Sequence, residues 1–250
     1  MMSLVNELIA FAEPLCTKET IVDVRIGLGY TLVELADGRA GLAWTPDKNQ
    51  AQSCTHMSHA GTLLDFTEKD LLMWLRDDSH LKRALGLATF NAVNSRVERV
   101  FNDQEAISQL GITETDHVAM VGHFAPLIPR IKKSGCRLEV IERNKQKEGL
   151  ELVDLRENYD PLAQCDVAII TSTSIINNSV DTLLATLKNN RSAVMLGPST
   201  PLCPEVFNAT RVSQLSGAFV ADVPEVKNII SQGGGTKLLK KHLNFVNHQA

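Results

Sequence analysis

Paired cysteines, long apolar runs and an excess of basic residues are all missing from this sequence. Its five cysteines, Cys16, Cys54, Cys136, Cys165 and Cys203, are widely spaced and form no Cys-x-x-Cys pair, which excludes a disulfide framework and a zinc ribbon. No apolar stretch approaches the ~20 residues that a bilayer-spanning helix needs. The formal net charge of −4 argues against a protein that coats nucleic acid. We therefore expect a cytoplasmic protein without a membrane or nucleic-acid partner.

The first part of the chain has the pattern of a small α+β unit. The stretch "TIVDVRIGLGYTLVELADGRAGLAW" predicts a three-stranded antiparallel meander, with turns at its glycine pair and at Asp37-Gly38. Apolar spacing and the N-cap residues Thr67 and Ser79 predict helices around this meander. The expected helices cover residues 3–15, 67–76 and 79–100.

The second part alternates strands with helices. Its strands contain near-continuous apolar runs such as "VAMV" and "AVML", which are typical of a parallel sheet buried on both faces. Helices between such strands predict an α/β fold with a doubly wound, Rossmann-like sheet, and we place the division between residues 1–108 and 109–250. The expected strands lie near 117–121, 137–142, 166–171, 192–196 and 217–220, and the helices near 126–134, 179–189, 223–231 and 236–247.

Ligands of open α/β sheets bind beyond the carboxyl ends of the strands, so the loops after each strand are the candidate sites. Gly122 and His123 follow the first strand, where the amino end of a helix starting near Pro126 would favour an anion and keep the imidazole neutral. Glu142 ends the next strand, at the position of a ribose-binding acid. The usual glycine pattern is missing, so we do not predict an ordinary NAD site. A tight turn and a surface glutamate are the alternative.

Two further loops are rich in hydroxyl groups or prolines. Four hydroxyl side chains at residues 171–174 follow a buried strand, which is more than helix capping requires. Gly197 begins the rigid loop "GPSTP", which resembles an anion cradle but could also be a plain connection. Asn91 lies on an apolar helix face, as a satisfied core amide or as a group facing a cleft. The ligand-binding candidates are Asn91, Gly122, Thr171, Ser172, Thr173, Asn177, Gly197, Pro198, Ser199 and Thr200.

A separate cluster, Cys54, His56 and His59, contains ligands suited to zinc or copper. No second cluster is evident in the sequence, so such a site would need distant ligands. An ordinary exposed loop is the alternative.

The strand-end segments together resemble a known family. "LATFNAVNS", "VGHFAPLIPRIK", "EVIERN", "CDVAIITSTSIINNSVDTLL" and "LGPSTPLCPEVF", in this order, are similar to the putative heavy-metal-chelation family of prokaryotes. The resemblance implies an enolase N-terminal-like domain joined to a Rossmann-like domain, with a site in the cleft between them. It carries Asn91, Gly122, Glu142, Thr173, Asn177 and residues 197–200 to that cleft.

Three functions follow from these patterns. The first is binding of a small polar or anionic ligand, or of a heavy-metal ion or metal chelate, between the two parts. The second is an enzyme acting on a pterin-, purine- or tetrapyrrole-like molecule without a bound metal, with Glu142 or His123 as the acid or base. The third is a non-catalytic binding module. A homodimer is expected only from its frequency among soluble proteins.

Overall fold

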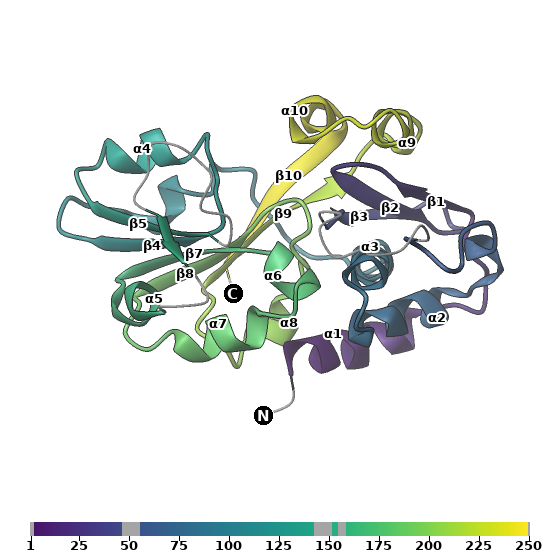
Figure 1. Cartoon of the computed structure of the whole chain (residues 1–250), viewed down its shortest axis with the longest axis horizontal. Helices are drawn as coiled ribbons and strands as arrows, with labels where there is room; N and C mark the ends of the chain where they lie inside the picture. The colour runs from purple at the N-terminus through teal and green to yellow at the C-terminus, as the bar shows by residue number, and fades with distance from the viewer. Residues whose placement is uncertain (1–2, 47–55, 143–151, 155–158, 250) are drawn as a thin grey trace.

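A computed structural model describes residues 3–46, 56–142, 152–154 and 159–249. The chain forms two sheets that lie side by side, with helices packed on both (Figure 1). We name them the small sheet, with three strands, and the large sheet, with seven. The expected α/β fold with an antiparallel meander followed by a Rossmann-like sheet is confirmed.

The small sheet is the predicted meander. Its strands are β1 (Asp23–Ile26), β2 (Tyr30–Glu34) and β3 (Ala40–Trp44), and each antiparallel pair is joined by a short turn. Gly38 has a φ of 82° in the second turn, a conformation that glycine adopts without strain. Both faces of β2 and β3 are buried. The sheet therefore needs helices on each side.

One face is covered by helices from the same part of the chain. Helix α3 (His80–Asn94) lies directly on β2 and β3, and α1 (Leu4–Ala12), α2 (Glu68–Met73) and η4 (Trp74–Arg76) pack against α3. The short helices η1 (Glu13–Leu15) and η3 (Leu63–Asp65) belong to the same part of the chain. A Cβ on Gly41 would lie 2.2 Å from the carbonyl oxygen of Ala88, so β3 and α3 touch backbone to backbone. The expected extension of α3 to Val100 is wrong. The helix ends at Asn94, where the hydroxyl of Ser95 bonds to the carbonyl of Ala92.

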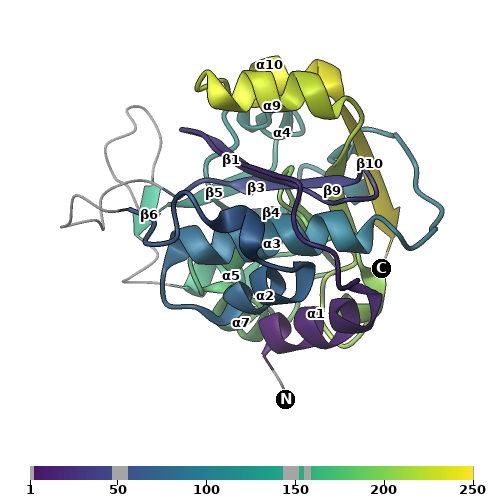
Figure 2. The ribbon, with the colours of Figure 1, turned by 90° about the vertical axis from the view of Figure 1, so that its right-hand side faces the viewer.

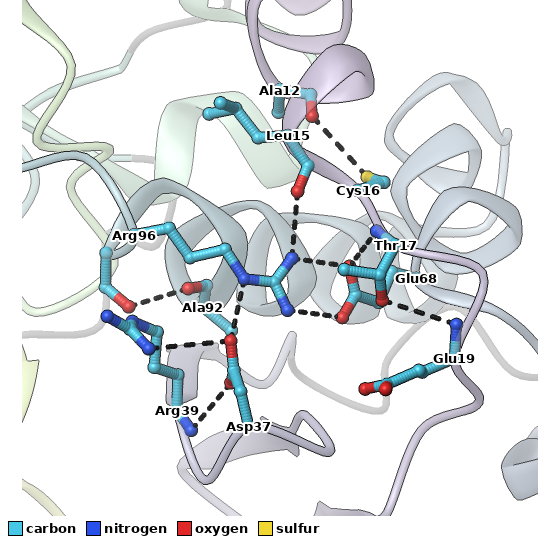
Figure 3. A network of polar contacts seen from close by, with 11 residues as sticks. Ala12, Leu15, Cys16, Thr17, Glu19, Asp37, Arg39, Glu68, Ala92 and Arg96 are labelled. Carbon is cyan, nitrogen blue, oxygen red and sulfur yellow. Dashed lines mark hydrogen bonds and ion pairs between the residues drawn. The ribbon is translucent and has the colours of Figure 1, made fainter.

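Beyond the end of α3, Arg96 holds a polar network (Figure 3). Its guanidinium donates to both carboxylate oxygens of the buried Glu68, at 2.7 and 2.6 Å, and to Asp37 at 2.7 Å. It also donates to the carbonyl of Leu15. Burial acts to raise the pKa of Glu68, but Arg96 and the N–H of Thr17 hold that pKa below its usual value of 4.5. The network ties α2, α3 and the second hairpin together.

The large sheet has the strand order β10-β9-β8-β7-β4-β5-β6. Its strands are β4 (His117–Val121), β5 (Arg137–Glu142), β6 (Leu152–Asp154), β7 (Val167–Thr171), β8 (Ser192–Leu196), β9 (Gln214–Val220) and β10 (Leu243–Gln249). All neighbours are parallel except β9 and β10. The chain runs outward from β4 to β6 and returns beside β4 as β7. The strand order therefore reverses between β4 and β7, which is the topological switch point of a doubly wound sheet.

Alternate residues of β4 face two separate apolar cores. Val118 and Met120 pack with Ile128 and Ile131 of α4 (Ile128–Lys132), whereas Ala119 and Val121 face the other side. On that other side lie α5 (Asp160–Gln164) and α7 (Val180–Thr186). Three further short helices of this part of the chain are η5 (Ser108–Leu110), α6 (Thr173–Ile176) and α8 (Pro204–Phe207). Helices on opposite faces on either side of the switch point are what this topology predicts.

The second face of the small sheet is covered by helices from the far end of the chain. These are α9 (Val223–Ser231), α10 (Thr236–Leu239) and η6 (Lys240–His242), which lie above β1–β3 while α3 lies below (Figure 2). Tyr30, Leu32 and Leu42 pack there against Val226 and Ile230. The prediction of a helix over residues 236–247 is wrong from Leu243 onward. The segment from Leu243 onward pairs with β9 instead, because seven ladder positions with β9 outweigh a local helical pattern.

Candidate functional site

The loops after β4, β7 and β8 meet at one edge of the large sheet. These strands are neighbours and parallel, so their carboxyl ends lie together. Gly122, with a φ of 92°, faces Thr171 across the switch point, and a Cβ on Gly122 would lie 3.0 Å from Cβ and Cγ2 of Thr171. We name this edge the rim and define it as residues 122, 171–174 and 197–200.

The β8 loop contacts the β7 loop in the same way. Gly197 has a φ of 126°, and a Cβ there would lie 3.1 Å from Oγ of Ser172. The N–H of Thr200 donates to the carbonyl of Gly197, which closes a turn that includes Pro198. The structure therefore brings Gly122, Thr171, Ser172 and Gly197 together, as their positions after parallel strands predict.

The hydroxyl groups of the rim are of two kinds. Thr171 and Thr173 share a hydrogen bond of 3.0 Å between their Oγ1 atoms. The hydroxyls of Ser172, Ser174 and Thr200 are buried and, within the described residues, have no hydrogen-bond partner. A buried hydroxyl without a partner costs about 1–3 kcal/mol. Three such groups lie at one edge of the large sheet.

The small sheet contacts the rim through Ser199. The N–H of Trp44, at the end of β3, donates to Oγ of Ser199 at 2.8 Å. Asn91 donates its side-chain amide to the carbonyls of Leu42 and Ser199, at 3.0 and 3.2 Å. Asn91 and Ser199 therefore join the two sheets. No residue pattern points to Trp44, because its contribution is a backbone N–H.

Arg83 is a second residue that sequence reasoning missed. It is buried on α3, and its guanidinium donates to the carbonyls of Ile175 and Ile176 at the end of α6, at 2.7 and 2.9 Å. Burial lowers its pKa from the usual value. The arginine thus fixes the short helix that carries Thr173 and Ser174. The available signal was the position of Arg83, directly before the apolar stretch "ALGLATF" of the predicted helix.

Asn177 has a different position from the other candidates. Its side-chain oxygen accepts from the N–H and the hydroxyl of Ser179, at 3.2 and 2.6 Å. It therefore supports the turn into α7.

His123 lies just beyond the end of β4, and Glu142 is the last residue of the neighbouring β5. Both side chains are half-buried, and the N–H of Gly122 donates to the carbonyl of Ile141, so β4 and β5 end side by side. The expected helix start near Pro126 is wrong, since α4 begins at Ile128 and has five residues. The N–H groups of Leu127 and Ile128 are both used by the carbonyl of Phe124. The amino end of a regular helix is therefore not next to His123.

The metal candidates do not form a site in the described part of the chain. Cys54 lies outside the described residues, and His56 is exposed. His59 packs against the rings of Phe66 and Trp74, each with centroids 5.3 Å away. No group of three or more His, Cys, Asp or Glu side chains within the described residues has the geometry to hold an ion.

The buried thiols of Cys165 and Cys203 also suit a heavy metal poorly. A soft metal binds the thiolate, and burial raises the pKa of Cys165 to about 11 and that of Cys203 to about 12. The donors at the rim are hydroxyls and amides, which bind organic anions rather than bare soft ions. The described residues therefore do not fit a resident heavy-metal ion.

A hollow of about 620 Å³ lies elsewhere, between α5 and α7. It is open, and its lining includes Tyr159, Asp181 and Lys188 but none of the rim residues. Asp181 also accepts from the N–H of Leu4 at the start of α1.

None of the helices in the described ranges combines the length and the apolar composition that a membrane-spanning helix requires.

Comparisons with known proteins agree with this fold. A crystal structure of a protein of unknown function from Pyrococcus horikoshii superposes with a TM-score of 0.85 at 22% identity, covering 99% of this chain and all of that one. A second one, from Desulfitobacterium hafniense, gives a TM-score of 0.81 at 20% identity, covering 99% and 98%. An uncharacterised protein of Methanocaldococcus jannaschii is 26% identical over 165 residues, which are 64% of this chain and 63% of that protein's length.

Two family models match the sequence in turn. Residues 9–94 and residues 105–248 each match a family described as putative heavy-metal chelation. The second match alone spans more than half of the chain. The chain therefore belongs to the putative heavy-metal-chelation family.

Proposed function

We propose that the protein binds a small polar or anionic organic ligand at the rim. The observation that supports this most directly is that the buried hydroxyls of Ser172 and Thr200 have no partner in the described part of the chain. They come from adjacent loops beside the switch point. Folded proteins pair nearly all of their buried polar groups, so unpaired ones at a switch point favour a role in binding. Glycines at residues 122 and 197 leave the backbone accessible to a close ligand.

The ligand class follows from the donors. Hydroxyl and amide groups hydrogen-bond to carboxylate or phosphate oxygens, and a heavy metal would then be cargo carried within its organic chelator. This form of the proposal reconciles the family description with a rim that lacks soft metal ligands among its residues. The small sheet, joined to Ser199 through Trp44, would supply the second wall of the site.

An enzyme is the second candidate. His123 and Glu142 lie at the adjacent ends of β4 and β5, and two titratable groups beside a ligand site are typical of acid–base chemistry. The substrate would be a pterin-, purine- or tetrapyrrole-like molecule. A ligand that binds with no turnover, and with equal affinity to the variants His123→Ala and Glu142→Gln, would favour a non-catalytic module instead.

Gly122→Ala tests the binding proposal, because its new methyl group would project at Thr171 within the rim. Gly38→Ala is the matched control: it carries similar positive-φ strain, but nothing lies within 4 Å of its Cβ. The melting temperature is measured with citrate, nickel–citrate, nickel chloride, ATP, a reduced pterin and uroporphyrin. A probe at 100 times its Kd should add ~2.7 kcal/mol of stability.

We expect at least one organic anion to stabilise the wild type and Gly38→Ala but not Gly122→Ala. A response to nickel chloride alone would contradict the proposal. Equal responses of the two glycine variants would contradict it as well.

A further inference from the structure

Strand β1 forms the outer edge of the small sheet. Within the described residues it pairs with β2 and with no other strand (Figure 1). The N–H of Gly27 bonds to the carbonyl of Tyr30, and the alternation of an antiparallel ladder then directs Arg25 and Asp23 toward β2. The backbone N–H and C=O groups of Val24 and Ile26 therefore point outward. An edge of this kind is a template for another strand.

Exposed apolar side chains gather around this edge. Of the seven large hydrophobic side chains that are exposed in the described chain, five lie near β1. Ile26 is the last residue of β1 and Val22 directly precedes the strand, and Leu64 belongs to η3, which contacts β1. Leu28 and Leu238 lie beside the neighbouring glycines 233 and 234. We name as the β1 surface the residues 23–26 with Val22, Leu28, Leu64 and Leu238.

The charges of β1 are self-complementary. Asp23 and Arg25 lie on the same face of the strand and form an ion pair of 2.8 Å. If two copies of β1 pair antiparallel with Val24 opposite Val24, each Asp23 faces the Arg25 of the other copy. The same register sets Ile26 opposite Val22, another exposed apolar side chain, whose own N–H is donated to the carbonyl of Glu34 within the small sheet. Opposite charges and apolar pairs across strands each contribute about 0.2–1 kcal/mol.

Neighbouring registers are unfavourable. The backbone groups of Val24 and Ile26 must face the partner strand, so the register of the two β1 strands shifts only in steps that preserve this alternation. One such shift sets Arg25 opposite Arg25, and the other sets Asp23 opposite Asp23. Like charges directly opposite each other destabilise a strand pair. The charge pattern therefore selects a single register.

We propose that the β1 surface binds a second copy of this chain, with the two β1 strands antiparallel about a two-fold axis at Val24. The two small sheets then form one continuous six-stranded sheet in the dimer, since each contributes three strands. Such an isologous contact uses the same residues from both copies and closes without further growth. The proposal concerns the edge of the small sheet and is independent of the ligand at the rim.

Sedimentation of the full chain at low and high concentration tests the dimer. Ile26→Glu places a carboxylate in the apolar contact, and we expect the dimer dissociation constant to rise by at least about tenfold. Phe245→Glu is the matched control, because Phe245 and Ile26 are both 39% exposed and both lie on an edge strand. The melting temperature at low concentration should be equal for the two variants, which shows that the monomer still folds.

Cysteine cross-linking tests the register. Val24→Cys should cross-link to itself under mild oxidation. Ile26→Cys alone should not, but a mixture of Ile26→Cys and Val22→Cys should form a mixed dimer. The unsubstituted protein controls for native cysteines. A wild type that is monomeric at every concentration would overturn the proposal, as would dissociation by Phe245→Glu rather than Ile26→Glu, or self-linking of Ile26→Cys in place of Val24→Cys.

Discussion

Thr31 and Glu68, buried in and beside the small sheet, have hydrogen-bond partners, whereas Ser172 and Thr200 at the rim of the large sheet have none within the ranges that the structure describes. Thr31 and Thr45 bond to each other at 2.9 Å within the small sheet, and Glu68 bonds to Arg96 beside it. At the rim, the equally buried hydroxyls of Ser172 and Thr200 have no partner among the described residues. Both regions belong to the same chain and face the same solvent.

The difference separates two uses of a buried polar group. A paired group adds to stability or costs little, but an unpaired one lowers stability unless something else binds it. The small sheet has the pattern expected of a scaffold. The rim has the pattern expected of a site that is completed by a ligand.

The largest effect should come from breaking the paired network beside the small sheet. Arg96→Met leaves the carboxylate of Glu68 buried without its cation, and we expect the free energy of unfolding to fall by about 3–5 kcal/mol in urea titrations. Arg39→Met is the control, because Arg39 is exposed and meets Asp37 only at 3.5 Å, so its loss should cost less than about 1 kcal/mol. Equal losses of stability in Arg96→Met and Arg39→Met would show that the network around Arg96 does not stabilise the fold more than an exposed ion pair does.

A somewhat smaller effect should follow from crowding the contact between the small sheet and α3. Gly41→Ala adds a methyl group 2.2 Å from the carbonyl of Ala88, and neither backbone is able to move aside cheaply. We expect a loss of about 1–3 kcal/mol in the free energy of unfolding. Gly29→Ala, whose methyl group would find its nearest neighbour at 3.8 Å, should change it by less than about 0.5 kcal/mol.

The sharpest test of the comparison uses two hydroxyl deletions. Ser172→Ala removes an unpaired group, so the free energy of unfolding without ligand should rise by about 1 kcal/mol. Thr31→Val removes one member of a hydrogen-bonded pair and leaves the hydroxyl of Thr45 without its partner. The free energy of unfolding should therefore fall by a similar amount. Thermal unfolding of both variants gives the two signs. If both variants lose stability, the rim hydroxyl is paired in solution and the contrast between the regions disappears.

The smallest expected effect is on the pH dependence of stability. The pKa of Glu68 is held below its usual value of 4.5 in the folded chain, so the ionised group stabilises the fold above that value. This contribution is lost as the pH falls through the folded pKa. Glu68→Gln should therefore lose less stability than the wild type between neutral and acid pH. Parallel curves for the two proteins would show that Glu68 does not contribute to acid sensitivity.

Much of the fold was predictable because strong local patterns agree with it. The apolar run at residues 117–121 became β4, and the N-cap Thr67 forms a complete capping box with Asp70. The pattern around Leu243 was misleading, since that segment is a strand only through its pairing with β9. Strand β6 was not predicted, because three residues carry too little periodic signal.

The candidate site was predictable in position but not in detail. Parallel strands end at one edge of a sheet, so the sequence alone predicts that Gly122, Thr171 and Gly197 lie close together. It could not separate the paired Thr171 from the unpaired Ser172, because that depends on rotamers and neighbours. Nor could it reveal Trp44, Arg83 or the structural role of Asn91, which arise from contacts more than 40 residues apart in the sequence.

The small sheet is made by the first third of the chain but is covered on one face by α9 and α10 from the last. During synthesis, Tyr30, Leu32 and Leu42 therefore leave the ribosome long before Val226 and Ile230 exist to shield them. The strands of the small sheet therefore stay partly unshielded until residues 223–239 have been synthesised. A nascent chain that stops before residue 223 would present a bare apolar sheet face to chaperones and proteases.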